Sequence, residues 1–126
     1  MPEYCFQNLI QMYKLSLKAE DFERANKIKA LIDKEFHRHY LHKDFPKLVG
    51  SNEQTLKAAF KELTGKSPYE YLTHVRIQQA EHLLTNTDYT IDSIAKRVGL
   101  DRSNLSKQFR KINGKPPATW RTENKN

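Results

Sequence analysis

The chain is 126 residues long, with 37% hydrophobic and 29% charged residues. That length suits one small domain with an appended helical arm, and no apolar run approaches the ~18 residues that a membrane-spanning helix needs. The low content of glycine (four) and proline (five) argues against a turn-dense β fold. The single cysteine and the lack of a signal-peptide pattern at the start favour a location in the reducing cytoplasm.

The net charge of +7 favours a polyanionic partner, nucleic acid first and an anionic membrane surface second. The excess is concentrated near the C-terminus, where residues 101–115 contain one acidic residue, Asp101. The basic residues of this segment are Arg102, Lys107, Arg110, Lys111 and Lys115.

Apolar residues recur at helical spacing from the start of the chain. The first stripe consists of Phe6, Leu9, Ile10, Tyr13 and Leu17. A second helix is predicted from Phe22 to Tyr40, after a break near Glu20. We therefore expect an amphipathic helical arm over residues 1–20, followed by a domain over residues 21–121. Residues 3–18 either pack on the first core helix of that domain or mediate self-association.

Capping residues and glycines bound the remaining predicted helices. The pattern Ser67-Pro68-x-Glu70 is a capping box, and Asp44, Thr90 and Asp101 are further candidate N-caps. The predicted segments are a short helix from Asp44 to Gly50, a helix from about Asn52 to Gly65, a long helix from Pro68 to Leu84, a short helix from Ile91 to Val98, a helix from Asp101 to Ile112, and a last turn that carries Trp120. The polar residues 122–126 are expected to be a disordered tail.

The chain contains an internal repeat with an offset of 49 residues. The matched positions pair Val49-Gly50 with Val98-Gly99, Leu56 with Leu105, Phe60 with Phe109, Leu63 with Ile112, Gly65-Lys66 with Gly114-Lys115, and Pro68 with Pro117. These are core and turn positions, whereas the polar positions between them differ. Two copies of one scaffold with separate outer faces explain this pattern.

Each repeat consists of a short helix, a turn that begins with glycine, and a longer helix whose first turns are polar. This is the pattern of a helix-turn-helix. The residues four, seven and eight positions after that glycine would point outward, and a DNA major groove admits one helix there. We expect the first helix-turn-helix at about residues 44–65 and the second at about residues 90–114.

A linker helix over residues 68–85 joins the two repeats. The 17 residues from Pro68 to Leu84 span about 26 Å at ~1.5 Å per residue, which is of the order of one DNA turn, ~34 Å. The predicted fold is therefore all-α, with two helix-turn-helix subdomains joined by a central linker helix and preceded by a helical arm. Such a chain could read two successive major-groove segments, and its target need not be palindromic.

Residues 36–121 resemble the C-terminal DNA-binding domain of AraC/XylS-type transcription regulators. The segment from Val75 to Leu84 is similar to the family pattern LRLxxAxxLL, and the segment from Thr90 to Leu100 is similar to sIxeIAxxxGF. The segment from Phe109 to Arg121 is similar to FkkxxGxsPxxyR, with Trp120 at the aromatic position. The resemblance implies a bacterial activator or repressor that binds double-stranded promoter DNA, with RNA polymerase as a further partner.

Two departures from the family pattern affect the predicted docking of the helices. Pro46 stands where the family usually has alanine, so we expect the leading helix of the first repeat to be short or displaced. The second repeat lacks one residue between Leu100 and Leu105 relative to GFxDxSxF. A sensor or dimerisation domain usually accompanies this type of domain, and 43 residues are too few for one. We therefore interpret the chain as a DNA-binding fragment without its effector domain.

The resemblance also implies which residues face DNA. The candidate base-facing residues are Gln54, Lys57, Ala58, Arg102, Ser103, Ser106 and Lys107. Glutamine can pair with adenine, and arginine or lysine with guanine. The candidate phosphate contacts lie at helix N-termini and among flanking cations. They are Asn52, Lys61, Lys66, Thr90, Arg110 and Lys111. The alternative for each residue is an ordinary solvated polar position.

Arg76 and Arg121 lie in otherwise apolar sequence, and we interpret them as ion-pairing or carbonyl-capping residues first and as phosphate ligands second. Phe60, Phe109 and Trp120 are predicted core residues.

The sequence contains no pattern that is typical of catalysis. It lacks a glycine-rich phosphate loop and a nucleophile–base constellation. The histidines have no nearby cysteine or acidic third ligand, so surface positions are favoured over a metal site. They are His37, His39, His42, His74 and His82. We expect no catalytic residue, no metal and no cofactor. Two other functions stay open: a basic protein-interaction module and an architectural nucleic-acid-binding module.

Overall fold

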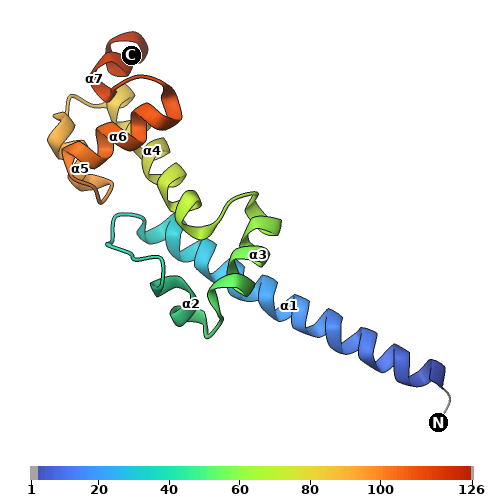
Figure 1. Cartoon of the computed structure of the whole chain (residues 1–126). Helices are drawn as coiled ribbons and strands as arrows, with labels where there is room; N and C mark the ends of the chain where they lie inside the picture. Colours follow the sequence, from blue (N-terminus) through green and yellow to red (C-terminus); the bar gives the residue numbers. More distant parts are fainter. Residues whose placement is uncertain (1–2, 126) are drawn as a thin grey trace. The chain divides into compact units, whose positions relative to one another are not determined.

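The structure, a computed structural model, describes residues 3–125, with side chains from Phe6 onward. This range contains seven helices and no strand (Figure 1). The helices are α1 (Glu3–Glu35), α2 (Asp44–Val49), α3 (Glu53–Thr64), α4 (Pro68–Asn86), α5 (Ile91–Arg97), α6 (Arg102–Asn113) and α7 (Pro117–Asn124). The all-α prediction is confirmed. None of these helices is both long enough and apolar enough to cross a membrane.

The chain divides into two compact lobes. The first lobe comprises the residues up to Ala30 and Leu41–Pro68, and it contains most of α1 together with α2 and α3. The second lobe comprises Leu31–Tyr40 and the residues from Tyr69 onward, with the end of α1 and nearly all of α4 to α7. Each lobe therefore contains one pair of a short and a longer helix, α2–α3 or α5–α6.

α1 is one continuous helix, so the predicted break near Glu20 is wrong. The sequence around Glu20 contains neither glycine nor proline. Arg24 lies within 4.0 Å of Glu20 and 3.4 Å of Asp21, which are pairings that support the helix at this point. The apolar stripe changes face between Leu17 and Ala25, and in the sequence this change mimics a break.

α1 also ends earlier than predicted, at Glu35 rather than at Tyr40. The hydroxyl of Tyr40 donates a hydrogen bond of 2.9 Å to the carbonyl oxygen of Glu35, which satisfies a carbonyl group at the C-terminus of the helix. Burial is the main reason that the pKa of Tyr40 is raised above its ordinary value. The proton therefore stays on the hydroxyl that this bond requires.

The predicted repeat is present in the backbone. α3 and α6 begin and end at positions that differ by 49 residues, and each is followed by a glycine with positive φ, 80° for Gly65 and 74° for Gly114. Asn52 and Asp101 cap them in the same way. The side chain of Asn52 accepts from the amide of Thr55 at 2.8 Å, and that of Asp101 accepts from the amide of Asn104 at 2.7 Å.

The leading helices of the two repeats differ. Thr90 is the predicted N-cap of α5, and its hydroxyl accepts from the amide of Ser93 at 3.1 Å. α2 is a six-residue helix without a side-chain cap at Lys43. The prediction of Asp44 as its N-cap is wrong, because Asp44 is the first helical residue and its carboxylate accepts instead from the amide of Leu41 at 2.7 Å. The short α2 agrees with the expectation based on Pro46.

In the first lobe, the buried side chains come from all three of its helices. Figure 1 shows α2 and α3 beside the middle of α1, and an ion pair of 3.3 Å joins Lys18 of α1 to Glu62 of α3. The buried residues of this lobe include Ala25 and Ile28 of α1, Phe45 and Pro46 of α2, and Leu56, Ala59 and Phe60 of α3.

The second lobe has a continuous apolar core between α4, α5 and α6. Its fully or almost fully buried members are Ile77, Ala80, Leu84, Ile94, Ala95, Val98, Leu105 and Phe109. Trp120 of α7 is partly buried and packs edge-on against Phe109, with ring centroids 5.7 Å apart. The prediction that Phe60, Phe109 and Trp120 are core residues is therefore confirmed, with Trp120 at the border of the core.

Gly99 has two structural requirements. Its φ is +85°, a conformation that side-chain-bearing residues rarely adopt. A Cβ atom at this position would also lie 2.5 Å from the carbonyl oxygen of His37. The turn between α5 and α6 therefore needs glycine both for its conformation and for the close approach of the segment after α1.

The C-terminus is more ordered than predicted. α7 continues to Asn124, past Thr122, where the sequence predicts a disordered tail. The hydroxyl of Thr122 donates to the backbone carbonyl of Ala118, and the side-chain amide of Asn124 donates to the backbone carbonyl of Trp120. Lys125 pairs with Asp88, and this pairing lowers the pKa of that exposed carboxyl group. The helix ends beyond the predicted point because its polar residues bond back to the helix and to the loop after α4.

Candidate nucleic-acid interface

α6 presents a basic outer face. Leu105 and Phe109 are buried on its inner side, which fixes the rotation of the helix. Arg102, Ser103 and Lys107 are consequently exposed, and Ser106 is half-buried. α6 carries two arginines, two lysines and no acidic residue, so its outer face attracts anions along its whole length.

α3 presents the equivalent face of the first repeat. Leu56 and Phe60 are buried, and the three predicted base-facing residues Gln54, Lys57 and Ala58 are all exposed. The two lysines of α3 are balanced by two glutamates. This face is therefore polar and nearly neutral, in contrast to that of α6.

The candidate phosphate contacts fall into two groups. Asn52 and Thr90 occupy the N-caps of α3 and α5, where their side-chain oxygens already accept a backbone amide. The groups that remain for an anion at these ends are the amide NH₂ of Asn52, the hydroxyl proton of Thr90 and the free backbone N–H groups of the first turns. The second group consists of cations: Lys61, Arg110 and Lys111 are exposed, and Lys66 is half-buried.

Arg102 has an acidic neighbour, Asp92, that was not predicted from the sequence. One guanidinium nitrogen of Arg102 lies 3.6 Å from a carboxylate oxygen of Asp92 in the first turn of α5, and both side chains are largely exposed. An ion pair this exposed is weak and can open for a stronger partner. Asp92 and Arg102 belong to different helices, so no local sequence pattern indicates the pairing.

Arg97 of α5 is a further exposed cation, and it was not among the residues predicted to contact DNA. Its guanidinium carbon lies 4.0 Å from the centre of the Tyr89 ring, and its Nε donates to the Ser93 hydroxyl at 3.3 Å. This stacking holds the guanidinium of Arg97 against the Tyr89 ring, and Tyr89 directly precedes the N-cap residue Thr90 in the sequence. Its position at the end of a helix that is basic in its last turn, Lys96-Arg97, was the available sequence signal.

Arg76 and Arg121 are carbonyl-capping residues, as predicted. Arg76 is 4% exposed, and its guanidinium donates to the carbonyl oxygens of Phe36 at 2.8 Å and Arg38 at 2.6 Å. Burial lowers the pKa of Arg76 from its ordinary value. These bonds tie α4 to the segment that follows α1.

Arg121 performs the same task at the end of α4. Its guanidinium donates to the carbonyl oxygens of Leu84 at 3.1 Å, Thr87 at 3.2 Å and Tyr89 at 2.7 Å. Three bonds from one side chain satisfy carbonyl groups that the end of α4 leaves open. Arg121 thereby ties α7 to the loop that leads into α5, and its donors are used within the protein.

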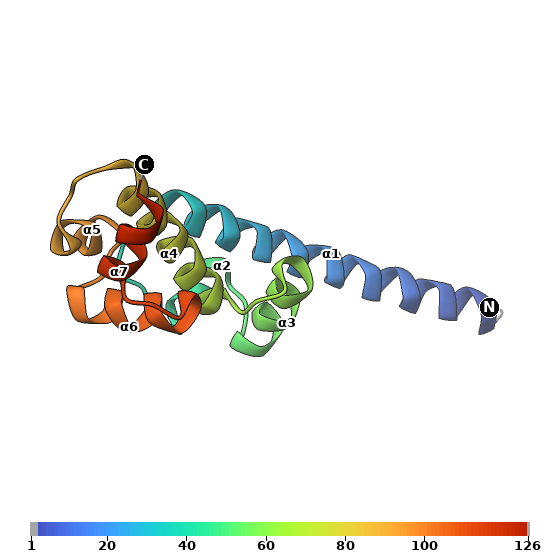
Figure 2. The same cartoon turned by 90° about the horizontal axis from the view of Figure 1, so that it is seen from above.

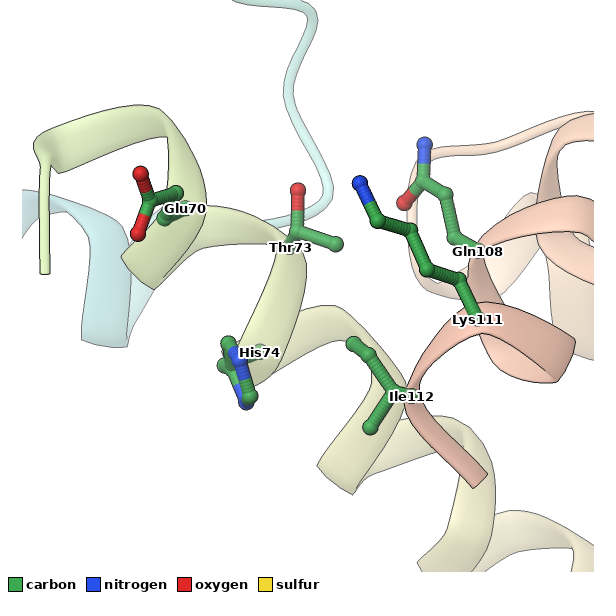
Figure 3. Close-up of a pocket in the computed structure, with 6 residues that line it drawn as sticks. All are labelled: Glu70, Thr73, His74, Gln108, Lys111 and Ile112. Carbon is green, nitrogen blue, oxygen red and sulfur yellow. The ribbon is translucent and has the colours of Figure 1, made fainter. Parts of the chain in front are cut away.

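A pocket of about 320 Å³ lies between α4 and α6 within the second lobe (Figure 3). Its lining residues are Glu70, Thr73 and His74 of α4 and Gln108, Lys111 and Ile112 of α6. Gln108 Oε1 is buried and has no hydrogen-bond partner among the described residues. Lys111, a candidate phosphate contact, is thus on the flank of α6 that faces α4 rather than at the centre of the outer face.

Residues 3–125, with side chains from Phe6, contain no group of three or more histidine, cysteine, aspartate or glutamate side chains that could hold a metal ion. The candidate interface instead consists of exposed polar and basic side chains on α3 and α6, two helices whose opposite faces are buried. It has the chemistry to contact an extended polyanion.

Comparison with known proteins places this arrangement among helix-turn-helix proteins. Residues 47–123 match a family described as a helix-turn-helix domain. The HTH-type transcriptional activator RhaR of Enterobacter sp. (strain 638) is 30% identical over 129 residues, and the match covers 96% of this chain and 46% of RhaR. The lactose operon transcription activator of Staphylococcus xylosus is 36% identical over 81 residues, with coverage of 64% and 29%. The chain spans less than half the length of these curated relatives.

Solved structures show the same similarity. The DNA-binding domain of the global transcriptional factor AdpA, determined in complex with a target DNA, has a TM-score of 0.74 and 27% identity, and the match covers 79% of this chain and 90% of that one. The C-terminal domain of AraT, a response regulator from Geobacillus stearothermophilus, has a TM-score of 0.76 and 25% identity, with coverage of 82% and 87%.

Proposed function

Since the chain belongs to the AraC-type family of helix-turn-helix DNA-binding domains, we propose that it binds double-stranded promoter DNA sequence-specifically as the DNA-binding part of a transcription regulator. The resemblance that the sequence showed to this family is confirmed. The observation that carries the proposal is the duplicated scaffold: two capped helices with buried inner faces and exposed polar outer faces, in a chain of net charge +7. AdpA, which shares the fold, was determined with its target DNA bound.

In this proposal α3 and α6 each enter a major-groove segment. Gln54, Lys57 and Ala58 face bases from α3. Arg102, Ser103, Ser106 and Lys107 face bases from α6, and the ion pair of Arg102 with Asp92 opens when guanine offers two acceptors. Phosphates are held by the N-terminal turns of α3 and α5 and by the flanking cations. These are Asn52, Lys61, Lys66, Thr90, Arg110 and Lys111.

The proposal also includes the partners of the protein and its location in the cell. RhaR is by name a transcriptional activator. We therefore propose RNA polymerase as a partner, the cytoplasm as the location, and a role without catalysis or a cofactor. Self-association through residues 3–18 belongs to the same proposal. A protein-interaction module or an architectural binder is not favoured, because these relatives are transcription activators by name.

Fluorescence anisotropy with a labelled duplex tests the proposal. If about six phosphates are neutralised, the dissociation constant rises about 10³-fold between 50 and 200 mM salt, since log K falls with a slope of about −0.9 per phosphate. A duplex enriched from a random pool should bind at least 10³-fold more tightly than a scrambled one of equal composition. Binding that is indifferent to both salt and sequence would contradict the proposal, and salt-sensitive binding without sequence preference would favour an architectural binder.

A further inference from the structure

The N-terminal half of α1 exposes an apolar surface, although the same helix is well packed further along. Ala25, Ile28 and Ile32 are 0–1% exposed. Seven large apolar side chains that precede them are 41–66% exposed. They are Phe6, Leu9, Ile10, Met12, Tyr13, Leu15 and Leu17. A monomeric protein rarely exposes so many neighbouring apolar side chains without a partner.

No described segment of the first lobe covers this surface. The ion pair between Lys18 and Glu62 of α3 marks the point where α1 leaves the other helices of the lobe. Figures 1 and 2 both show α1 continuing beyond α2 and α3 toward its N-terminus with no segment of this lobe beside it. A single helix of this length is marginal in water, because most helical stability in proteins comes from packing.

The spacing of the exposed residues points to the partner. Phe6, Ile10, Tyr13 and Leu17 follow one another at intervals of four, three and four residues, and we refer to them as the α1 seam. This 4-3-4 spacing matches the pattern of a two-stranded coiled coil over almost two heptads, with Ile10 and Leu17 at a positions and Phe6 and Tyr13 at d positions. The next d position is Glu20, which lies 4.0 Å from Arg24 of its own helix, so the seam ends there.

We propose that a second copy of the chain packs in parallel along the α1 seam, in register, so that each seam residue meets its own counterpart. No charged side chain occupies an a or d position from Phe6 to Leu17, so two identical copies meet without like-charge contact until Glu20. A parallel arrangement also brings α3 of both copies to the same end of the seam, because α3 packs on α1 beyond Leu17. The two copies can then occupy neighbouring segments of one duplex.

The size of the seam sets the strength of the pairing. Four side chains about half exposed offer roughly 400 Å² per copy, or roughly 800 Å² in total, less than the ~1,200 Å² at which stable interfaces begin. Each copy also carries a net charge of +7, which opposes pairing in solution. The pair is therefore weak in the free protein and is strengthened when a polyanionic duplex holds two copies together. The pairing gives a surface and a geometry to the self-association proposed above for residues 3–18, and its strengthening by a duplex rests on the proposed DNA binding.

Disulfide trapping tests the pairing without reference to DNA. Cys5, the single cysteine, is first replaced by serine. Ile10→Cys is then compared with Gln11→Cys, an exposed position one residue outside the seam, under mild oxidation at about 100 μM protein and 0.5 M salt, which screens the net charge. We expect Ile10→Cys to form covalent dimer at least ten times faster than Gln11→Cys. Equal rates would overturn the proposal. Dimer that forms only when Ile10→Cys is mixed with Tyr13→Cys would overturn the parallel arrangement.

Sedimentation equilibrium supplies a second measurement on the otherwise unaltered chain. Ile10→Asp places two negative charges face to face in the seam and should weaken the dimer at least tenfold, whereas Gln11→Asp should leave it within twofold. Circular dichroism checks that both variants stay helical. A 60-base-pair random duplex, added at low salt, should increase the trapping rate of Ile10→Cys. Anisotropy in the same samples reports DNA binding separately, so a failure of DNA binding is distinguishable from a failure of pairing.

Discussion

The two helix-turn-helix repeats share a backbone but differ in surface. α3 and α6 have the same length, the same type of N-cap and the same glycine after their last turn. α3, however, balances two lysines against two glutamates, whereas α6 has four basic residues and no acidic one. The leading helices differ too, since α5 has a side-chain cap and α2 has none. The comparison indicates that buried and turn residues determine the scaffold, while exposed residues are free to differ. We expect the second repeat to supply most of the electrostatic affinity.

The largest expected effect is on the free energy of unfolding, and it concerns the glycines in the turns of the two repeats, Gly50 and Gly99. Gly99→Ala should destabilise the protein by more than about 3 kcal/mol, because the new Cβ atom meets the His37 carbonyl oxygen in addition to the cost of positive φ. Gly50→Ala, at φ +65° with no atom within 4 Å of the new Cβ, should cost only about 1–2 kcal/mol. Urea unfolding of both variants measures the difference. Equal losses would mean that the close approach of His37 is not a constraint.

The second prediction concerns the basic residues of α6 and α3 and their contribution to DNA affinity. Replacing Lys107 and Arg110 of α6 by glutamine should weaken binding to a random duplex by about 2–3 kcal/mol and reduce the salt slope by about two. The matched variant of α3, with Lys57 and Lys61 replaced, should lose less than about 1 kcal/mol, because α3 has no net positive charge and its face attracts the duplex less. Anisotropy titrations at several salt concentrations measure both. A larger loss for the α3 variant would contradict the expectation that the second repeat supplies most of the electrostatic affinity for DNA.

A third prediction separates base reading from phosphate binding. Arg102→Ala should cost about 1–3 kcal/mol on a selected site and relax the preference at one base pair, because the guanidinium can bind guanine through two hydrogen bonds. Gln54→Ala should act in the same way at the other block of the site. Competition titrations with single-base variants of the site measure the preference. A loss that is as large on random DNA would reassign Arg102 to the phosphate backbone.

The smallest effect concerns the helix caps. Thr90→Ala should reduce the free energy of unfolding by about 1 kcal/mol, because the amide of Ser93 loses its acceptor. Lys43→Ala, at the uncapped start of α2, should change stability by less than about 0.5 kcal/mol. Thermal unfolding at constant pH measures both changes. If the two variants lose equal stability, the difference between the leading helices is not energetic.

The sequence predicted the parts of the fold that depend on local patterns. The repeat of Leu56 and Phe60 in Leu105 and Phe109, together with the glycines, identified both helix-turn-helix scaffolds. The continuous α1 was not predicted, because a change in the face of an apolar stripe resembles a break when no partner helix is known. The exposure of the apolar residues between Phe6 and Leu17 was not predicted either, because it depends on which other segments pack against α1.

The candidate site could be predicted only in part. Exposed positions on α3 and α6 follow from the helical period once the buried residues are known. The carbonyl-capping role of Arg76 and Arg121 was predicted, but the carbonyl groups that they bind were not, because these lie more than 30 residues away in sequence. The pairing of Asp92 with Arg102 and the stacking of Arg97 on Tyr89 likewise depend on how helices and loops meet. Contacts of this type have no signature in one sequence.

Sequence selection from a randomised duplex pool tests the central claim most directly, because it reads both repeats at once. If α3 and α6 each read a major-groove segment, the enriched sequences contain two unlike blocks with centres about ten base pairs apart. Arg102→Ala should then relax the preference at one base pair of one block, and Gln54→Ala at one base pair of the other. A single enriched block, or a pool that stays random after several rounds, would contradict the account.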